Sequence, residues 1–132
     1  MKFIKLLLTA LLAAFALAAC SGGNSPDGVA KTFMTAAYKG EIDKAMALVY
    51  IPEDMTATKK EAANGKLRMI LAGAKDGADK RGGLVRVEVI DVETDSNNAD
   101  RARVNLRVHF KDGQKTENAK LIRVKGKWLV NL

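Results

Sequence analysis

Cysteine and histidine are nearly absent from this sequence, since Cys20 and His109 are each the only residue of their kind among 132. One of each is too few for a Cys/His zinc site, and a single cysteine cannot form an internal disulfide. Aromatic residues are also scarce, at 5% of the chain. We therefore expect no metal, no cofactor and a single small domain.

What the chain does have is a strongly apolar N-terminus. Sixteen of the first 19 residues are apolar, and the three others include Lys2 and Lys5. A short basic region followed by an apolar stretch over 6–19, too short to span a bilayer comfortably, is typical of a secretory signal peptide. Without these 19 residues the formal charge falls from +7 to +5, because 20 basic residues then face 15 acidic ones.

The single cysteine follows this stretch directly. The sequence LAAC at residues 17–20 resembles the lipobox of bacterial lipoproteins, in which the cysteine sulfur receives a diacylglycerol and the preceding peptide is cleaved. The resemblance predicts a signal peptide over 1–19, then a lipidated Cys20 with a flexible tether over 20–25, then one domain over 26–132. The alternative is a plain signal peptide with an incidental cysteine.

Two acyl chains hold a protein stably on a membrane surface without spanning it. The residue after the cysteine is Ser21, which in lipoproteins favours the outer membrane. We therefore expect a protein of the bacterial cell envelope, anchored to the outer membrane and facing the periplasm.

Helical periodicity marks the first part of the domain. Ser25 followed by Pro26 is a helix-start signal, and apolar residues recur at helical spacing up to Gly40, where we expect the first helix to end. The same spacing predicts a second helix over 41–50 and a third over about 58–75.

From Leu84 the apolar period changes from 3.6 to 2, which predicts strands. We expect one strand over 84–93, with a bulge or bend near Val89, and a second over 101–111. The strand positions expected to face the core are Val85, Val87, Val89, Val104, Leu106, Val108, Phe110, Leu121 and Val130.

Two glycine-containing turns complete the predicted sheet. The Asp-Gly pair at 112–113 is a hairpin signal that would place Leu106 opposite Ala119. The Lys-Gly pair at 125–126 is a second turn, between the last two strands. Three helices followed by a four-stranded antiparallel meander predict an α+β domain, with the N-terminal helices packed on one face of a curved sheet.

The helix pair over 33–45, the later sheet and the ending GKWLV at 126–130 resemble the nuclear transport factor 2-like superfamily, a cystatin-like fold. Within it the chain is similar to small bacterial lipoproteins of unknown function. The resemblance implies a cone-shaped domain that is often dimeric. It does not imply an enzyme.

Catalytic members of that superfamily line a cavity with Asp, His or Tyr side chains, because an acid or base must reach its substrate. None of the inward strand positions given above ionises. We therefore expect no catalytic residue.

A basic stripe is the sharper hypothesis. Arg103, Arg107 and His109 alternate onto the outer face of the second strand, with Lys120 across on the third and Arg86 on the first. Guanidinium groups on a rigid sheet can bind phosphate or carboxylate, so these five residues are candidates for binding an anion or a partner. The alternative is a solvated face, kept basic for solubility. No acid partner is expected for His109.

The sequence thus predicts a lipid-anchored, non-catalytic binding or accessory module of the cell envelope. Its expected partners are the membrane, through the lipid, and an envelope protein or anionic envelope component. Nucleic acid is not expected, since stacking aromatics are missing from the basic face. Two alternatives remain: a small-ligand carrier or enzyme with an apolar cavity between helices and sheet, and a structural domain that associates through its outer sheet face, including as a homodimer.

Overall fold

The computed structural model describes residues 24–132. The predicted signal peptide, Cys20 and most of the predicted tether lie outside the described residues. Within residues 24–132, no helix is both long enough and apolar enough to cross a membrane.

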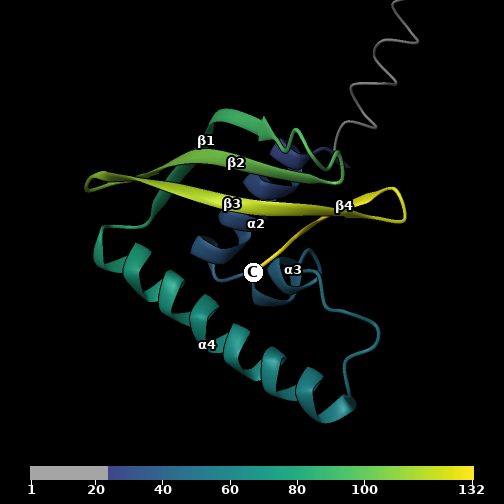
Figure 1. Cartoon of the computed structure of the whole chain (residues 1–132). Helices are drawn as coiled ribbons and strands as arrows, with labels where there is room; N and C mark the ends of the chain where they lie inside the picture. The colour runs from purple at the N-terminus through teal and green to yellow at the C-terminus, as the bar shows by residue number, and fades with distance from the viewer. Residues whose placement is uncertain (1–23) are drawn as a thin grey trace, which may run out of the picture.

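The domain has three helices followed by a four-stranded sheet (Figure 1). The elements are α2 (Pro26–Lys39), α3 (Ile42–Met46), α4 (Ala57–Lys80), β1 (Leu84–Thr94), β2 (Arg101–Phe110), β3 (Gln114–Val124) and β4 (Lys127–Val130). The strands pair antiparallel in the order β1-β2-β3-β4. Helix α2 packs against the sheet, and α4 packs against α2 and α3. The predicted α+β class, with helices on one face of an antiparallel meander, is confirmed.

Helix α2 begins and ends where the sequence predicts. The Ser25 hydroxyl accepts a hydrogen bond from the Gly28 backbone N–H at 3.2 Å, which satisfies one of the free donors of the first turn. At the other end Gly40 has a φ of 79°, a left-handed conformation that glycine adopts without steric cost.

The second helix is shorter than predicted. Helix α3 ends at Met46 because the next residues pair with β4 instead. The Val130 N–H donates to the Leu48 carbonyl at 2.7 Å, and the Tyr50 N–H donates to the Val130 carbonyl at 2.8 Å. In a helix continuing to residue 50 the Tyr50 N–H would donate to the Met46 carbonyl instead.

The third helix is longer than predicted and ends at Lys80 rather than near residue 75. Leu67, Leu71 and Ala78 are its buried residues, and the last of these lies beyond the predicted end. Burial of Ala78 outweighs the weak helix propensity of the glycines along α4.

Strand β1 carries two irregularities, one between Leu84 and Arg86 and one between Val89 and Asp91. The second confirms the predicted bulge. The first was not predicted, and it leaves Val85 without a partner on β2, with 60% of its surface exposed. The prediction that Val85 faces the core is therefore wrong.

The hairpin between β2 and β3 differs from the prediction by two residues. Leu106 lies opposite Glu117, and Ala119 lies opposite Val104. The reason lies outside the hairpin: the Lys111 N–H donates to the Gly83 carbonyl at 3.0 Å, and the Asp112 N–H donates to the Arg81 carbonyl at 2.8 Å. A shift of two leaves every side chain on its predicted face.

The turn between β3 and β4 is confirmed at residues 125 and 126. Lys125 has a φ of 53° and Gly126 a φ of 77°, as a two-residue turn that matches the twist of the strands requires.

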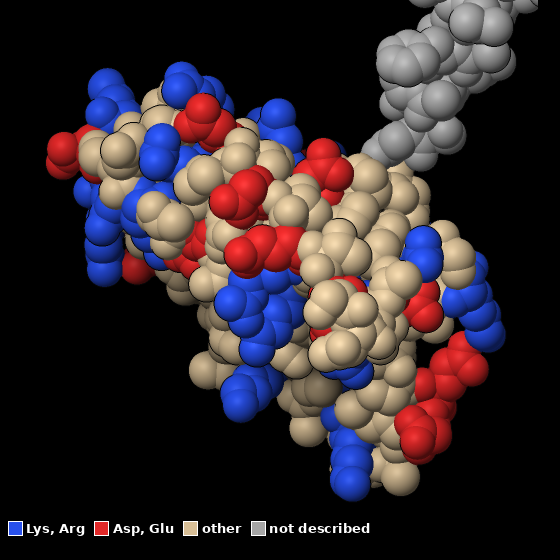
Figure 2. Space-filling model, turned by 45° about the horizontal axis from the view of Figure 1, so that its top comes forward, with Lys and Arg blue, Asp and Glu red and all other residues tan. Residues whose placement is uncertain are grey.

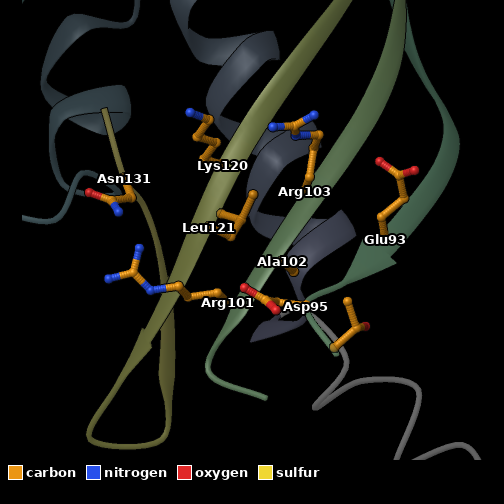
Figure 3. Close-up of a pocket in the computed structure, with 9 residues that line it drawn as sticks. Glu93, Asp95, Arg101, Ala102, Arg103, Lys120, Leu121 and Asn131 are labelled. Atoms are coloured by element: carbon orange, nitrogen blue, oxygen red, sulfur yellow. The ribbon is translucent and has the colours of Figure 1, made fainter. Parts of the chain in front are cut away.

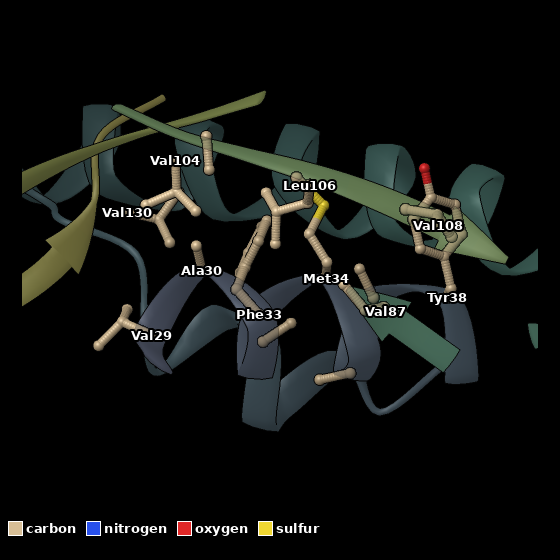
Figure 4. Packing of buried hydrophobic residues seen from close by; sticks show 14 of the residues in the cluster. Val29, Ala30, Phe33, Met34, Tyr38, Val87, Val104, Leu106, Val108 and Val130 are labelled. Carbon is tan, nitrogen blue, oxygen red and sulfur yellow. The ribbon is translucent and has the colours of Figure 1, made fainter. Parts of the chain in front are cut away.

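The core lies between α2 and the sheet (Figure 4). Phe33 and Met34 of α2 point toward Leu106 and Val108 of β2, and all four are buried. Phe110 is buried as well, and its ring meets that of Tyr38 edge to face, with 5.3 Å between the ring centres. Side chains therefore fill the space beneath β2. Between helices and sheet, where the sequence left room for an apolar cavity, a small open pocket of about 220 Å³ remains beside Phe33 and Met34, against β3 and β4.

Candidate functional site

All five predicted surface residues lie on the sheet face that points away from α2. Their registers show this, because Arg103, Arg107 and His109 alternate with the buried side chains of β2. Arg86 lies opposite His109, and Lys120 lies opposite Arg103. The structure separates these residues into two groups along the strands.

The first group gathers around Glu88 of β1. The His109 Nε2 atom lies 3.0 Å from Glu88 Oε1, and the Arg107 Nη1 atom lies 3.9 Å from the same oxygen. The hydrogen bond from His109, together with nearby positive charge, holds the pKa of the Glu88 carboxyl below its ordinary value. The expectation that His109 has no acid partner is therefore wrong.

More acids follow along β1, so the outer face is mixed in charge rather than basic. The Asn105 amide donates to Asp91 Oδ1 at 2.6 Å, and Glu93 lies opposite Arg103. The bulge after Val89 shifts the alternation and brings Asp91 onto the same face as Glu88. Figure 2 shows acidic and basic side chains interspersed on its visible face.

The second group lines an open pocket of about 360 Å³ where β1 ends and β2 begins (Figure 3). Its cations are Arg101, Arg103 and Lys120, and its acids are Glu93 and Asp95. Within the described part of the chain, none of the three cations forms an ion pair or a side-chain hydrogen bond. Three positive side chains are therefore available here to an anion.

Backbone hydrogen bonds hold the walls of this pocket. The Asp95 N–H donates to the Arg101 carbonyl at 3.1 Å, and Asp95 Oδ1 accepts from the Asn97 N–H at 2.8 Å. On the far side the Asn131 N–H donates to the Lys120 carbonyl at 2.8 Å. The backbone that carries the charged side chains is therefore held in place by hydrogen bonds before a ligand binds.

The structure brings together only part of what the sequence singled out. Arg103 and Lys120 line the pocket, whereas Arg86, Arg107 and His109 lie outside it. Sequence reasoning missed Arg101, which shares the alternation of Arg103. It also missed the two acids, whose place depends on the bulge and on how the turn over 95–100 closes.

A separate ionisable cluster lies on the helix side of the sheet. The Tyr38 hydroxyl donates to Glu117 Oε1 at 3.2 Å, and Lys115 Nζ lies 2.7 Å from the same oxygen. Burial raises the pKa of Tyr38, and the hydrogen bond to Glu117 raises the pKa of Lys115. Ionisable residues of β3 thus lie on the inward side, which the sequence-based choice of inward positions did not include.

A larger apolar groove lies beside α4. It encloses about 460 Å³ between α4 and the segment over 49–55. Its lining is mainly apolar and includes Ile51, Met55 and Ile70, with Lys66 as its cation. Residues 24–132 contain no group of three or more His, Cys, Asp and Glu side chains that could hold a metal ion.

Comparison with known families adds one match. The model of the family described as "Domain of unknown function (DUF4878)" matches residues 19–131. No curated protein matches the chain.

Solved structures with the same fold also match. A crystal structure from Campylobacter jejuni described as a "Putative NTF2-like transpeptidase" is 25% identical with a TM-score of 0.75, and the match covers 82% of this chain and 98% of that one. A de novo designed NTF2 fold protein is 14% identical with a TM-score of 0.49, covering 80% and 81%. A cystatin-like protein from Ruminococcus gnavus is 15% identical with a TM-score of 0.47, covering 81% and 36%. The fold is thus NTF2-like, as the resemblance implied, and the last two matches add nothing to that assignment.

Proposed function

The chain belongs to the DUF4878 family of domains of unknown function, and from this premise we propose that it is a lipid-anchored cell-envelope protein whose domain binds an anionic group without catalysing a reaction. The observation that carries the binding proposal is the set of three cations in the pocket on the outer face, none of which forms an ion pair within residues 24–132. Membership of the family supplies no activity, so the proposal depends on the residues themselves.

The anchor is supported by the sequence around Cys20. An apolar stretch with a basic start precedes the only cysteine, and small, polar residues follow it. The described chain begins only four residues later, at Asn24, whose side-chain oxygen accepts a hydrogen bond from the Trp128 N–H at 2.9 Å. A lipid on Cys20 would therefore keep this end of the domain within a few residues of the membrane surface.

Anion binding is supported by the kinds of side chain present. Arg101 and Arg103 each offer a planar fork of N–H donors that fits a phosphate or a carboxylate, and Lys120 adds a third positive charge. No ion pair within residues 24–132 has to break when these cations bind an anion.

The anchor is tested by Cys20→Ser in cells that express the full chain. We expect incorporation of labelled palmitate to be lost and the protein to leave the membrane fraction. Ser21→Ala, next to the cysteine, is the matched control and should be labelled normally. Continued membrane association with unchanged lipid labelling in Cys20→Ser would overturn the anchor.

The anion site is tested with inorganic phosphate, titrated into the purified lipidated chain in non-ionic detergent and followed by NMR. We expect shifts at the backbone amides of residues 101–103 and 120, and their loss in the double variant Arg101→Gln, Arg103→Gln. Arg86→Gln, on the same sheet face but outside the pocket, is the control. Equal responses in both variants would overturn the pocket as the binding site.

A small-ligand carrier is the second candidate function, because the groove beside α4 is apolar and has a volume typical of ligand sites. A fluorescent apolar probe should then bind the wild-type protein and lose affinity in Ile70→Glu. Met69→Glu, at the preceding and more exposed residue, should bind it normally. Probe binding that ignores Ile70→Glu would remove this candidate.

A further inference from the structure

The pocket on the outer face holds charges of both signs that are not paired with each other. Glu93 of β1 lies directly opposite Arg103 of β2, and Arg103 lies directly opposite Lys120 of β3. Acidic groups therefore come from β1 and the turn after it, and cationic groups come from β2 and β3. In Figure 3 Glu93 lies on the β1 side of Arg103, and Lys120 lies on the other side.

The two acids keep oxygen atoms available. Glu93 has one weak partner, the Asn105 amide at 3.5 Å from Oε2. Asp95 accepts the Asn97 N–H with Oδ1 alone. A ligand that carries an ammonium group beside its anionic group could thus donate to the acids while the cations hold its anion. Since neighbouring strands lie about 4.8 Å apart, the two charges of such a ligand would have to be only a few bonds apart.

The position of the pocket indicates where such a ligand would come from. The pocket lies at the end of the sheet that contains the turn over 95–100. Arg123 ties this turn to the β3–β4 hairpin, with its Nε donating to Asp100 Oδ1 at 2.9 Å, and its guanidinium lies 5.2 Å from the centre of the Trp128 ring. Asn24 is bonded to the backbone of the same tryptophan, so the pocket and the start of the described chain lie at one end of the domain (Figure 1).

We propose that the pocket binds the ethanolamine phosphate headgroup of a membrane lipid, with the phosphate on Arg101, Arg103 and Lys120 and the ammonium on Glu93 and Asp95. This inference rests on the proposed anion site and on the proposed anchor. A chain anchored at Cys20 holds this end of the domain beside lipid headgroups, where their local concentration is high. The acyl chains would hold the domain at the membrane, and the headgroup site would give it a fixed orientation there.

A free dipeptide also carries one charge of each sign, an ammonium at its N-terminus and a carboxylate at its C-terminus. The membrane lipid is favoured because the pocket lies at the end of the domain where the anchor is proposed. The β2–β3 hairpin lies at the opposite end. The dipeptide Ala-Ala therefore enters the experiment as a competing ligand.

The experiment compares three soluble headgroups on the lipidated chain in non-ionic detergent by isothermal titration calorimetry. Glycerophosphoethanolamine supplies a phosphate and an ammonium with N–H donors, glycerophosphocholine has the same charges without those donors, and glycerophosphoglycerol has the phosphate alone. We expect the ethanolamine compound to bind about two- to fivefold more tightly than the other two, as a partly exposed charge pair contributes.

The variant Glu93→Gln, Asp95→Asn should abolish this preference while leaving glycerophosphoglycerol binding in place. Glu88→Gln, an acid of the same strand outside the pocket, is the matched control and should keep the preference. The Arg101→Gln, Arg103→Gln variant should lose all three headgroups.

Three outcomes would overturn the inference. Equal binding of all three headgroups, unchanged in Glu93→Gln, Asp95→Asn, would leave an anion site without headgroup selectivity. Tighter binding of Ala-Ala than of glycerophosphoethanolamine, lost in the same variant, would assign the pocket to a short peptide. Absence of binding by the headgroups and by inorganic phosphate alike would remove the anion site and the inference together.

Discussion

The carboxylate of Glu88 and the imidazole of His109 lie 3.0 Å apart across two neighbouring strands of the sheet, although 21 residues separate them in the chain. The contact joins β1 to β2 on the outer face, and Arg107 lies near enough to add its charge. It pairs the charges of His109 and Glu88 at one end of the predicted basic stripe. Arg101, Arg103 and Lys120, which form no ion pair within residues 24–132, lie toward the other end of the face.

Glu88→Gln should make the stability of the protein depend less on pH in the acid range. The pKa of Glu88 is lowered in the folded protein, so the contribution of its carboxylate is present above the ordinary value of 4.5 and is lost as the pH falls through the lower, folded value. Thermal unfolding followed by circular dichroism should show the difference between wild type and variant shrinking from pH 6 to pH 3. Glu61→Gln, on the exposed surface of α4, is the control. A difference that is the same at every pH would contradict the prediction.

Tyr38→Phe should cost about 0.5–1.5 kcal/mol of unfolding free energy, because Glu117 loses a hydrogen-bond donor while the ring still packs on Phe110. Urea denaturation measures the loss. Since burial raises the pKa of Tyr38, its neutral form is favoured by folding, and the benefit should disappear only as the pH rises above the ordinary tyrosine range. Tyr50→Phe is the matched control, and an equal loss there would speak against the Glu117 contact as the cause.

The irregularity at the start of β1 predicts unequal losses of stability for the same substitution at two nearby valines. Val87 is buried and Val85 is 60% exposed, so Val87→Thr should lose about 1–3 kcal/mol while Val85→Thr should change stability by less than about 0.5 kcal/mol. The two substitutions add the same hydroxyl to the same strand. Similar losses for the two variants would contradict the prediction, because an alternation without the first irregularity would bury both valines on the same face.

Leu71→Ala should destabilise the protein by about 2–5 kcal/mol, because this side chain is 2% exposed and is one of the few buried residues that attach α4 to the rest of the domain. Met69→Ala, two residues earlier on the same helix and 77% exposed, should cost little. The comparison is made by urea denaturation with far-ultraviolet circular dichroism. Similar losses for the two variants would mean that α4 packs through a different face.

Local signals in the sequence were enough for most of the fold. The caps of α2, the change of period at Leu84 and the turn at 125–126 each depend on residues that are close together in the chain, and the structure confirms all three. The end of α3 could not be predicted in the same way, because the backbone of Leu48 and Tyr50 pairs with Val130 at the far end of the chain.

The candidate site was likewise predictable only where it depends on residues that are close together in the chain. Alternation on β2 by itself determined that Arg103, Arg107 and His109 share one face, because side chains of a strand point alternately to its two sides. Only the tertiary structure decided which of them have an acidic partner within the described residues. The second bulge of β1 places Asp91 on the outer face, and the closed turn over 95–100 puts Asp95 beside Arg101. Pairing between strands depends on residues distant in the chain, and a one-residue irregularity is enough to move a carboxylate from one face of the sheet to the other.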